Sequence, residues 1–199
     1  AHVCLRGVKY GADDDEIMNL LAVGAFGNGD THVLFFINTL YGYVLKGLYM
    51  LFPHLNCYLA LMIILNMLAV YTLCSHFGRR LDVSAQIFIT IVINALLDYV
   101  MYNELEYTRS AFLYTVVGGV LFVEAVGDIC RERKEKASEK HITLRYVVKS
   151  IPGAVFLILG YMMRVAPFML CMPLIVLLIA TEGLRVASET GDVLKGGIM

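Results

Sequence analysis

Long apolar runs alternate with short polar stretches along most of the chain, and five of these runs are close in length to a membrane-spanning helix. About 20 consecutive apolar residues are needed for a helix to cross the hydrocarbon layer of a bilayer. The runs that we predict to be transmembrane helices are residues 57–74, 83–101, 110–126, 146–163 and 165–181. Only Arg164 separates the last two, which joined together would be too long for one span. Arg164 and Pro167 therefore predict a tight hairpin at one membrane surface.

The first apolar segment, residues 33–52, is interrupted by Asn38 and Lys46, and two interpretations of it are open. These two polar residues are eight positions apart, so they lie on roughly one face of a helix. A helix lying in the membrane interface could turn that face to water. We favour this interfacial interpretation over a further span, and it leaves five spans in the chain.

A shorter mixed stretch, residues 17–26, has apolar residues at helical spacing and predicts a short surface helix. Four consecutive acidic residues, 13–16, come directly before it, where the helix dipole favours negative charge. Gly24, Gly27 and Gly29 follow and should end the helix. The predicted order is therefore an acidic turn, a surface helix, a glycine-rich break and the interfacial helix.

Composition agrees with a membrane location. Of the 199 residues, 59% are hydrophobic and 17% are charged, against about 45–50% and about 25% in soluble domains. The fold class that we predict is all-α, a multispanning transmembrane helix bundle of about five spans with short interfacial helices in an extracytoplasmic loop. A net charge of −1 predicts no nucleic-acid partner. The chain has no Trp, so its 12 Tyr are candidates for an aromatic belt at the membrane surface.

Basic residues decide the predicted orientation. They are concentrated at Arg79 and Arg80, within residues 127–149, and in the tail at Arg185 and Lys195. Because basic loops stay in the cytoplasm, the acidic segment falls on the extracytoplasmic side if residues 33–52 lie in the interface, and on the cytoplasmic side if they span. The predicted regions are an extracytoplasmic segment 1–56, a bundle 57–182 that contains the cytoplasmic loop 127–149, and a cytoplasmic tail 183–199.

The order of these parts carries a family resemblance. The parts that match are Asp14-Asp15, the helix 17–26, Asp30-Thr31-His32, the helix 33–52 and Gly78-Arg79-Arg80-Leu81. This order resembles the C-type glycosyltransferase superfamily, and its uncharacterised bacterial branch in particular. The stretches Glu106–Ala111 and Gly160–Arg164 are similar to a span entry and a hairpin in that branch. That family also has a span before Asp13 and several after residue 182, so we expect the chain to be a fragment or an incomplete copy.

The resemblance implies an activity and a place for it. Such enzymes transfer a sugar from a polyprenyl-phosphate donor to a lipid, glycan or protein acceptor, here outside a bacterial cytoplasmic membrane. The family's acidic pair matches Asp14 and Asp15, so Asp14 is the first choice for the catalytic base and Asp15 the second. The base would take the proton of the acceptor hydroxyl.

Other polar residues of the predicted outer face are candidates for the substrate or a metal. The candidate substrate-binding residues are His32, Asn38, Lys46, Arg109 and Arg164. The cations suit a phosphate, whereas snorkelling arginines, a helix-start histidine and a capping asparagine are the structural alternatives. The adjacent carboxylates Asp13, Asp14, Asp15 and Glu16 are candidate ligands for a divalent cation such as Mg²⁺ or Mn²⁺.

Two other classes of function stay open. The first is a non-catalytic membrane subunit, or a truncated paralogue that only packs against partners. The second is a small proton-coupled transporter that would use Asp98 and Glu124, the two acids inside predicted spans, as a relay. Asn66 and Asn94 are expected to hydrogen-bond between helices.

Overall fold

Helices make up nearly all of the described chain, as the apolar pattern predicts. The computed structural model describes residues 9–25, 34, 37–78, 81–98, 101–102, 104–135 and 142–196; for residues 98, 130–135, 142–147 and 186–196 it describes the backbone alone. The elements in chain order are β1 (Lys9–Tyr10), α2 (Asp13–Val23), α3 (Thr39–Leu51), α4 (Cys57–Gly78), α5 (Val83–Asp98), β2 (Glu104–Leu105), α6 (Tyr107–Glu135), α7 (Ile142–Met163) and α8 (Val165–Gly196).

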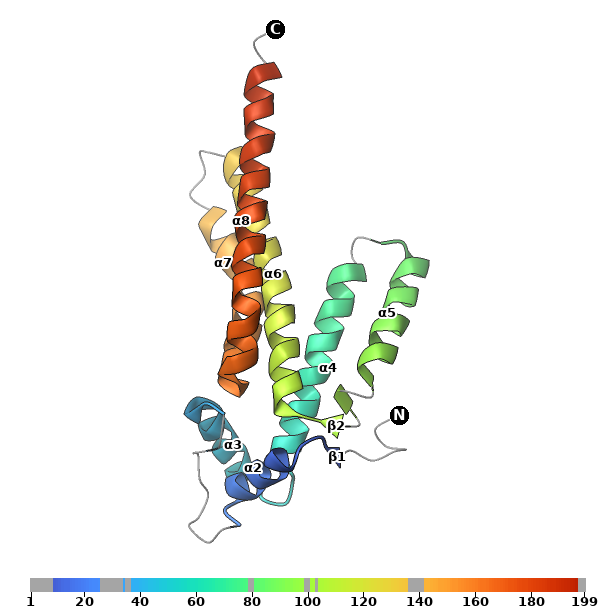
Figure 1. Ribbon diagram of the computed structural model, residues 1–199, viewed down its shortest axis with the longest axis vertical. Coiled ribbons are helices and arrows are strands. Elements are labelled where there is room, and N and C mark those ends of the chain that lie inside the picture. Colours follow the sequence, from blue (N-terminus) through green and yellow to red (C-terminus); the bar gives the residue numbers. More distant parts are fainter. Residues whose placement is uncertain are drawn as a thin grey trace.

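The five long helices run in alternating directions along the long axis of the molecule (Figure 1). The short helices α2 and α3 and the strands β1 and β2 lie together across one end, which we call the acidic end because residues 13–16 are there. The C-terminal end of α4, the start of α5 and the C-terminal end of α8 lie toward the opposite end. This arrangement separates the acidic segment from Gly78 by the length of α4, as the sequence predicts.

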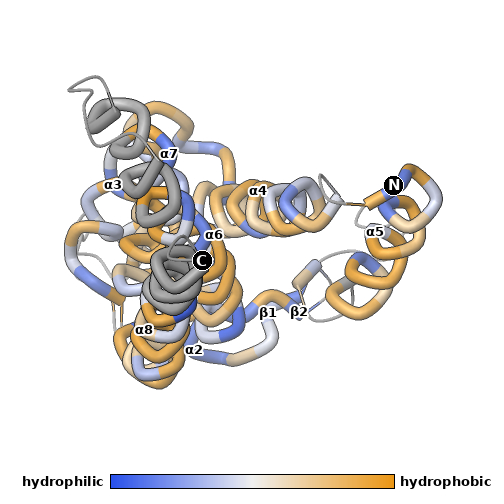
Figure 2. Tube along the Cα trace, turned by 90° about the horizontal axis from the view of Figure 1, so that it is seen from above, coloured by the Kyte–Doolittle hydropathy of each residue, from blue (hydrophilic) through white to orange (hydrophobic). Residues whose placement is uncertain are grey.

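Three of these helices are long and apolar enough to cross a membrane. They are Cys57–Gly78, Tyr107–Ile129 and Val165–Arg185. Two shorter apolar helices, Val83–Leu97 and Val148–Met163, fall at the other two predicted spans. Figure 2 shows α5 set apart from α7 and α8, with apolar residues along much of its length. An apolar surface of this kind, around helices of this length, is what a bilayer requires.

The acidic end differs from the prediction in two details. Helix α2 begins at Asp13, so the four acidic residues form its first turn instead of a turn before it. It ends at Val23, and the Gly24 that caps it has a φ of 79°, in the left-handed region that glycine adopts without strain, as expected for the break. Helix α3 begins at Thr39, later than predicted, because the Asn38 side chain caps it by accepting from the Leu40 N–H at 3.0 Å.

The length of α3 favours the interfacial interpretation. Its 13 residues rise about 20 Å, and a hydrocarbon layer is about 30 Å thick. The helix lies across the acidic end, where the Asn38 N–H donates to the Met162 carbonyl at 2.8 Å. Residues 26–33 lie outside the described part of the chain. They include Gly27 and Gly29 of the glycine-rich break and the whole Asp30-Thr31-His32 stretch.

The predicted tight turn at Arg164 is confirmed, and its place at a membrane surface stays a prediction. Helix α7 ends at Met163 and α8 begins at Val165, so a single residue joins the two antiparallel helices. Pro167 is the third residue of α8, in the first helical turn, where a proline removes no intrahelical hydrogen bond. Helix α7 brings the chain to the acidic end, the hairpin places Arg164 there, and α8 leads away again.

Glycines bring α6 and α7 into backbone contact. A Cβ atom on Gly153 would lie 2.8 Å from the Phe122 nitrogen, and one on Gly118 would lie 2.6 Å from the Leu157 nitrogen. Both distances are shorter than van der Waals contact, and the neighbouring atoms are backbone that cannot rotate away. Small residues at such crossings let membrane helices approach closely. This approach holds α7, and through the hairpin α8, against α6.

We expect Gly153→Ala to destabilise the protein by about 1–3 kcal/mol, because the added methyl group overpacks the α6–α7 contact. Gly183→Ala in α8 is the matched control, since nothing lies within 4 Å of its Cβ position. Thermal unfolding in detergent measures both. Equal melting temperatures for the two variants would contradict the close approach of α6 and α7.

Candidate functional site

One carboxylate of the acidic segment is buried, and the other three are exposed. Asp15 has no exposed surface, whereas Asp13, Asp14 and Glu16 are exposed. Helix geometry explains the difference, because Asp15, Met18 and Ala22 repeat every three or four residues and form the face of α2 that packs on the bundle. The candidate site therefore has one carboxylate at its centre.

The Asp15 carboxylate joins α2 to two long helices. The Tyr58 hydroxyl of α4 donates to Asp15 Oδ1 at 2.5 Å, and the backbone N–H of Tyr107, at the start of α6, donates to the same atom at 3.3 Å. Among the described residues, no group donates to the other oxygen, Oδ2. A buried carboxylate therefore has one oxygen fixed by two donors and one that is unpaired within the described chain.

Burial changes the acidity of this group. It raises the pKa of Asp15 from 3.8 to about 6, and the nearby charges of Glu106 and Asp14 add to the rise. The two donors, Tyr58 and Tyr107, oppose the rise because they stabilise the ionised form. At neutral pH the group is mostly ionised, yet it is a stronger base than an exposed aspartate.

Tyrosines and asparagines form a polar shell around Asp15. The Tyr49 hydroxyl of α3 donates to Asn19 Oδ1 of α2 at 2.6 Å and accepts from the Tyr58 N–H at 3.1 Å. Asn56 donates to the Tyr10 hydroxyl at 2.8 Å. The sequence predicts that tyrosines form a belt at the membrane surface, and several of them instead bond to polar groups at the acidic end. No local pattern shows these bonds, because the partners lie up to 46 positions apart.

The two predicted arginines reach the acidic end in different settings. The Arg164 guanidinium lies over the Tyr107 ring, 5.0 Å from its centre, and donates to the Thr108 hydroxyl. Tyr107 therefore lies between Arg164 and Asp15: its ring contacts the guanidinium, and its backbone N–H donates to the carboxylate. Arg109 pairs with Glu106 at 2.9 Å and with Glu104 at 3.7 Å, so two carboxylates offset its charge.

The remaining candidates are less closely associated. Asn38 caps α3, and Lys46 is a half-buried residue of the same helix. His32 lies outside the described residues, so its role stays a prediction. Within the described chain, no three His, Cys, Asp or Glu side chains converge on a point that could hold a metal ion. A divalent cation at residues 13–16 also stays a prediction.

The two predicted interhelical asparagines differ. Asn66, fully buried in α4, accepts from the Tyr114 hydroxyl of α6 at 2.8 Å and donates to the Met101 carbonyl at 3.2 Å. The prediction for Asn66 is confirmed. Asn94 is exposed and donates to the Thr90 carbonyl of its own helix at 2.8 Å, so the prediction for Asn94 is wrong. On an exposed face of α5, the acceptor nearest to the Asn94 side chain is a backbone carbonyl of the same helix.

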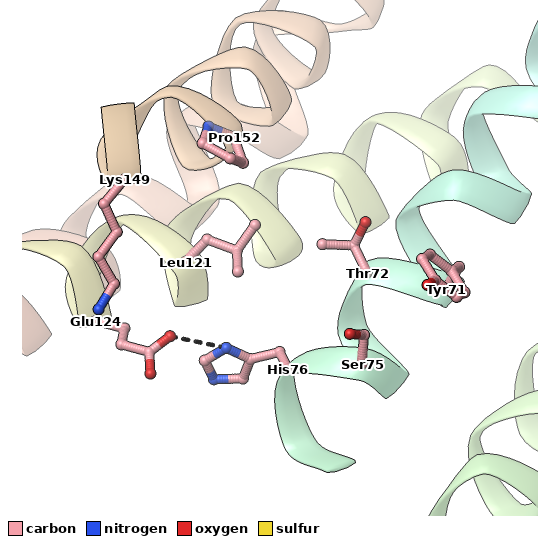
Figure 3. A pocket seen from close by; sticks show the side chains of 8 residues that line it. All are labelled: Tyr71, Thr72, Ser75, His76, Leu121, Glu124, Lys149 and Pro152. Carbon is pink, nitrogen blue, oxygen red and sulfur yellow. Dashed lines mark ion pairs between the residues drawn. The ribbon is translucent and has the colours of Figure 1, made fainter. Parts of the chain in front are cut away.

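A second polar group lies toward the opposite end of the bundle. His76 Nδ1 of α4 is 2.9 Å from Glu124 Oε2 of α6, and Lys149 of α7 pairs with Asp128 of α6. His76, Glu124 and Lys149 border a crevice of about 390 Å³ between α4, α6 and α7 (Figure 3). Glu124, one of the two proposed relay residues, is thus paired with His76 near the C-terminal end of α4. For the other proposed relay residue, Asp98, the structure describes the backbone alone.

The comparisons with known proteins identify no relative. No family model, no curated protein and no solved structure matches the chain. The resemblance to the C-type glycosyltransferases therefore stays a prediction, and the function must be inferred from the geometry of the two polar groups.

We expect the stability of the protein to depend on pH through Asp15. Its pKa is higher in the folded chain than in the unfolded one, so protons favour the folded state. The free energy of unfolding should fall as pH rises from about 4 to about 6, and then stay level. Asp15→Asn should remove this slope and raise the stability at neutral pH by roughly 1–3 kcal/mol.

Unfolding in detergent across this pH range measures the effect, with Asp13→Asn as the matched control because Asp13 is exposed on the same helical turn. The control should keep the slope of the unaltered chain. An identical slope in Asp15→Asn would contradict a raised pKa at this carboxylate.

Proposed function

We propose that this chain is an integral membrane protein of the C-type glycosyltransferase kind, with its reaction centre at the acidic end. It would transfer a sugar from a polyprenyl-phosphate donor to a lipid, glycan or protein acceptor outside a bacterial cytoplasmic membrane. One observation carries the proposal: Asp15 is a buried carboxylate with a pKa of about 6 and an oxygen that no described residue donates to. Carboxylates tuned in this way are typical of general bases.

The chemistry uses the two oxygens of Asp15 differently. Oδ1 is held by Tyr58 and Tyr107, which fixes the orientation of the carboxylate. Oδ2 would take the proton of the acceptor hydroxyl while the acceptor oxygen bonds to the anomeric carbon of the sugar. The bond from that carbon to the phosphate oxygen breaks, and polyprenyl phosphate leaves. The proposal requires substrate entry to uncover Asp15, whose side chain is fully covered in the structure.

This assignment reverses the order of preference that the family resemblance implies, in which Asp14 comes first. Asp14 is exposed, whereas the Asp15 carboxylate is buried and held by two donors. For the phosphate of the donor, Arg164 is the preferred partner because it lies over the ring of Tyr107, whose backbone N–H donates to Asp15. A planar guanidinium can bind two phosphate oxygens at once. Asn38 and Lys46 stay candidates for the sugar.

The proposal includes five spans. The three long apolar helices would cross the bilayer, and the shorter Val83–Leu97 and Val148–Met163 would cross with them, since all five run along the same axis. A stretch of 15 or 16 residues rises about 22–24 Å, so the bilayer would thin slightly around α5. The acidic end would face the extracytoplasmic side.

A second candidate is a non-catalytic membrane subunit, and the surfaces of α5 and α8 favour it. Only 11% of the apolar window of α8 is buried, and α5 exposes large apolar side chains such as Phe88 and Leu96. Lipid alone would cover such surfaces, but partner helices would cover them equally well. The first candidate requires transfer by the chain itself, whereas the second does not.

We expect membranes that contain the chain to transfer sugar from a polyprenyl-phosphate donor, and Asp15→Asn to lower the rate at least about a hundredfold. The rate should rise with pH up to about 6 and then level off, because the base must be ionised. Asp14→Asn should lower the rate much less. Asp82→Asn is the matched control, since Asp82 precedes α5 at the far end of α4.

An unchanged rate in Asp15→Asn would contradict the assigned base. Absence of transfer by the intact chain, with each donor sugar tested, would contradict the enzyme proposal and favour the subunit.

We expect a cysteine at Leu55 to react with a membrane-impermeant thiol reagent added outside intact cells, and a cysteine at Leu81 to react only after the membrane is opened. Both side chains are exposed, at opposite ends of α4. Each is introduced into a chain whose five native cysteines are replaced by serine. Labelling of both from outside would contradict the proposed topology.

A further inference from the structure

The crevice near the opposite end has the size and lining of a ligand site. Its volume of about 390 Å³ lies within the usual range of about 300–1,000 Å³. The residues that line it are Tyr71, Thr72, Ser75 and His76 of α4, Leu121 and Glu124 of α6, and Lys149 and Pro152 of α7. Figure 3 shows the charged ends of Lys149, Glu124 and His76 gathered at one end of the crevice, with the hydroxyls of Thr72 and Ser75 along the α4 wall.

The lining holds both signs of charge. Glu124 supplies a carboxylate and Lys149 an ammonium group, and the two side chains come from different helices. Lys149 also pairs with Asp128, so its positive charge is partly offset. A purely anionic ligand would meet the carboxylates of Glu124 and Asp128, and a purely cationic ligand would meet Lys149. A ligand that carries one positive and one negative group fits this lining best.

Exposed apolar side chains extend from the crevice along α4 and α7, toward the middle of the length of these helices. On α4 they are Ile64 and Leu68, which share a helical face with Tyr71 and have exposed fractions of 60% and 49%. On α7 Val155, one turn from Pro152, is 47% exposed. Polar groups at the end of a helix pair, with apolar groups along its length, match a molecule with a polar head and an apolar tail.

We propose that this crevice binds the headgroup of a membrane phospholipid that carries a phosphate and a primary amine. The phosphate would accept hydrogen bonds from Lys149 and from the hydroxyl of Ser75, since the Thr72 hydroxyl already donates to the Leu68 carbonyl. The ammonium group would donate to Glu124, in place of or beside His76. The acyl chains would follow the exposed apolar faces of α4 and α7. This site is independent of the reaction proposed for the acidic end.

The test measures which lipids stay bound to the full chain. The purified protein is mixed with equal amounts of dioleoyl phosphatidylethanolamine, phosphatidylglycerol and phosphatidylcholine, and retained lipid is counted by native mass spectrometry. Phosphatidylethanolamine should be retained most, since phosphatidylglycerol lacks the amine and the quaternary amine of phosphatidylcholine cannot donate. Lys149→Met should weaken its retention about tenfold, as expected for the loss of one charge-assisted hydrogen bond.

Further variants separate headgroup recognition from loss of folding. Lys149→Arg keeps the charge and should keep the retention, and Lys9→Met at the acidic end is the matched control that should change nothing. Glu124→Gln should remove the preference for phosphatidylethanolamine over phosphatidylglycerol. Equal retention of the three lipids by the unaltered chain, or no effect of Lys149→Met, would overturn the proposal. Competition by phosphoethanolamine alone at equal concentration would overturn the membrane as the source of the ligand.

Discussion

The described acidic end depends on the burial of one carboxylate. Asp15 holds α2 against the bundle, because its Oδ1 atom accepts hydrogen bonds from the Tyr58 hydroxyl of α4 and the Tyr107 backbone N–H of α6. A buried charge is costly unless it is paired and hydrogen-bonded, so these donors must stay in place while Asp15 is ionised. Burial against the bundle raises the pKa of the group to about 6, although the two donors that hold α2 oppose the rise. The packing of α2 therefore decides both the position and the basicity of Asp15.

Helix α6 connects this end to the rest of the molecule. Near its start it donates to Asp15, further along it bonds to Asn66 through Tyr114, and through Glu124 it pairs with His76 near the end of α4. On its other side the glycines bring its backbone against α7. A bundle built in this way has two polar regions on the two sides of a largely apolar middle. Each region borders a different end of the proposed membrane-spanning layer.

Much of the helical plan can be predicted from the sequence, because apolar run length and single breaks such as Arg164 and Gly24 are local signals. The predicted start of α2 is wrong, since four acidic residues in a row suggest a solvated turn while the helix dipole favours them in a first turn. The choice between Asp14 and Asp15 needs the fold, because helix phase alone does not show which face packs inward. The pairing of His76 with Glu124 joins distant residues on separate helices, and no local pattern carries it.

A buried, tuned carboxylate at the acidic end is tested most directly by the titration of Asp15 itself. Aspartate labelled with ¹³C at the carboxyl carbon can be followed by NMR in lipid, and the Asp15 signal is assigned by its loss in Asp15→Asn. We expect this signal to titrate with an apparent pKa of about 6, well above the ordinary value of 3.8. Titration at or below the ordinary value would contradict both the burial of Asp15 and its assignment as the base.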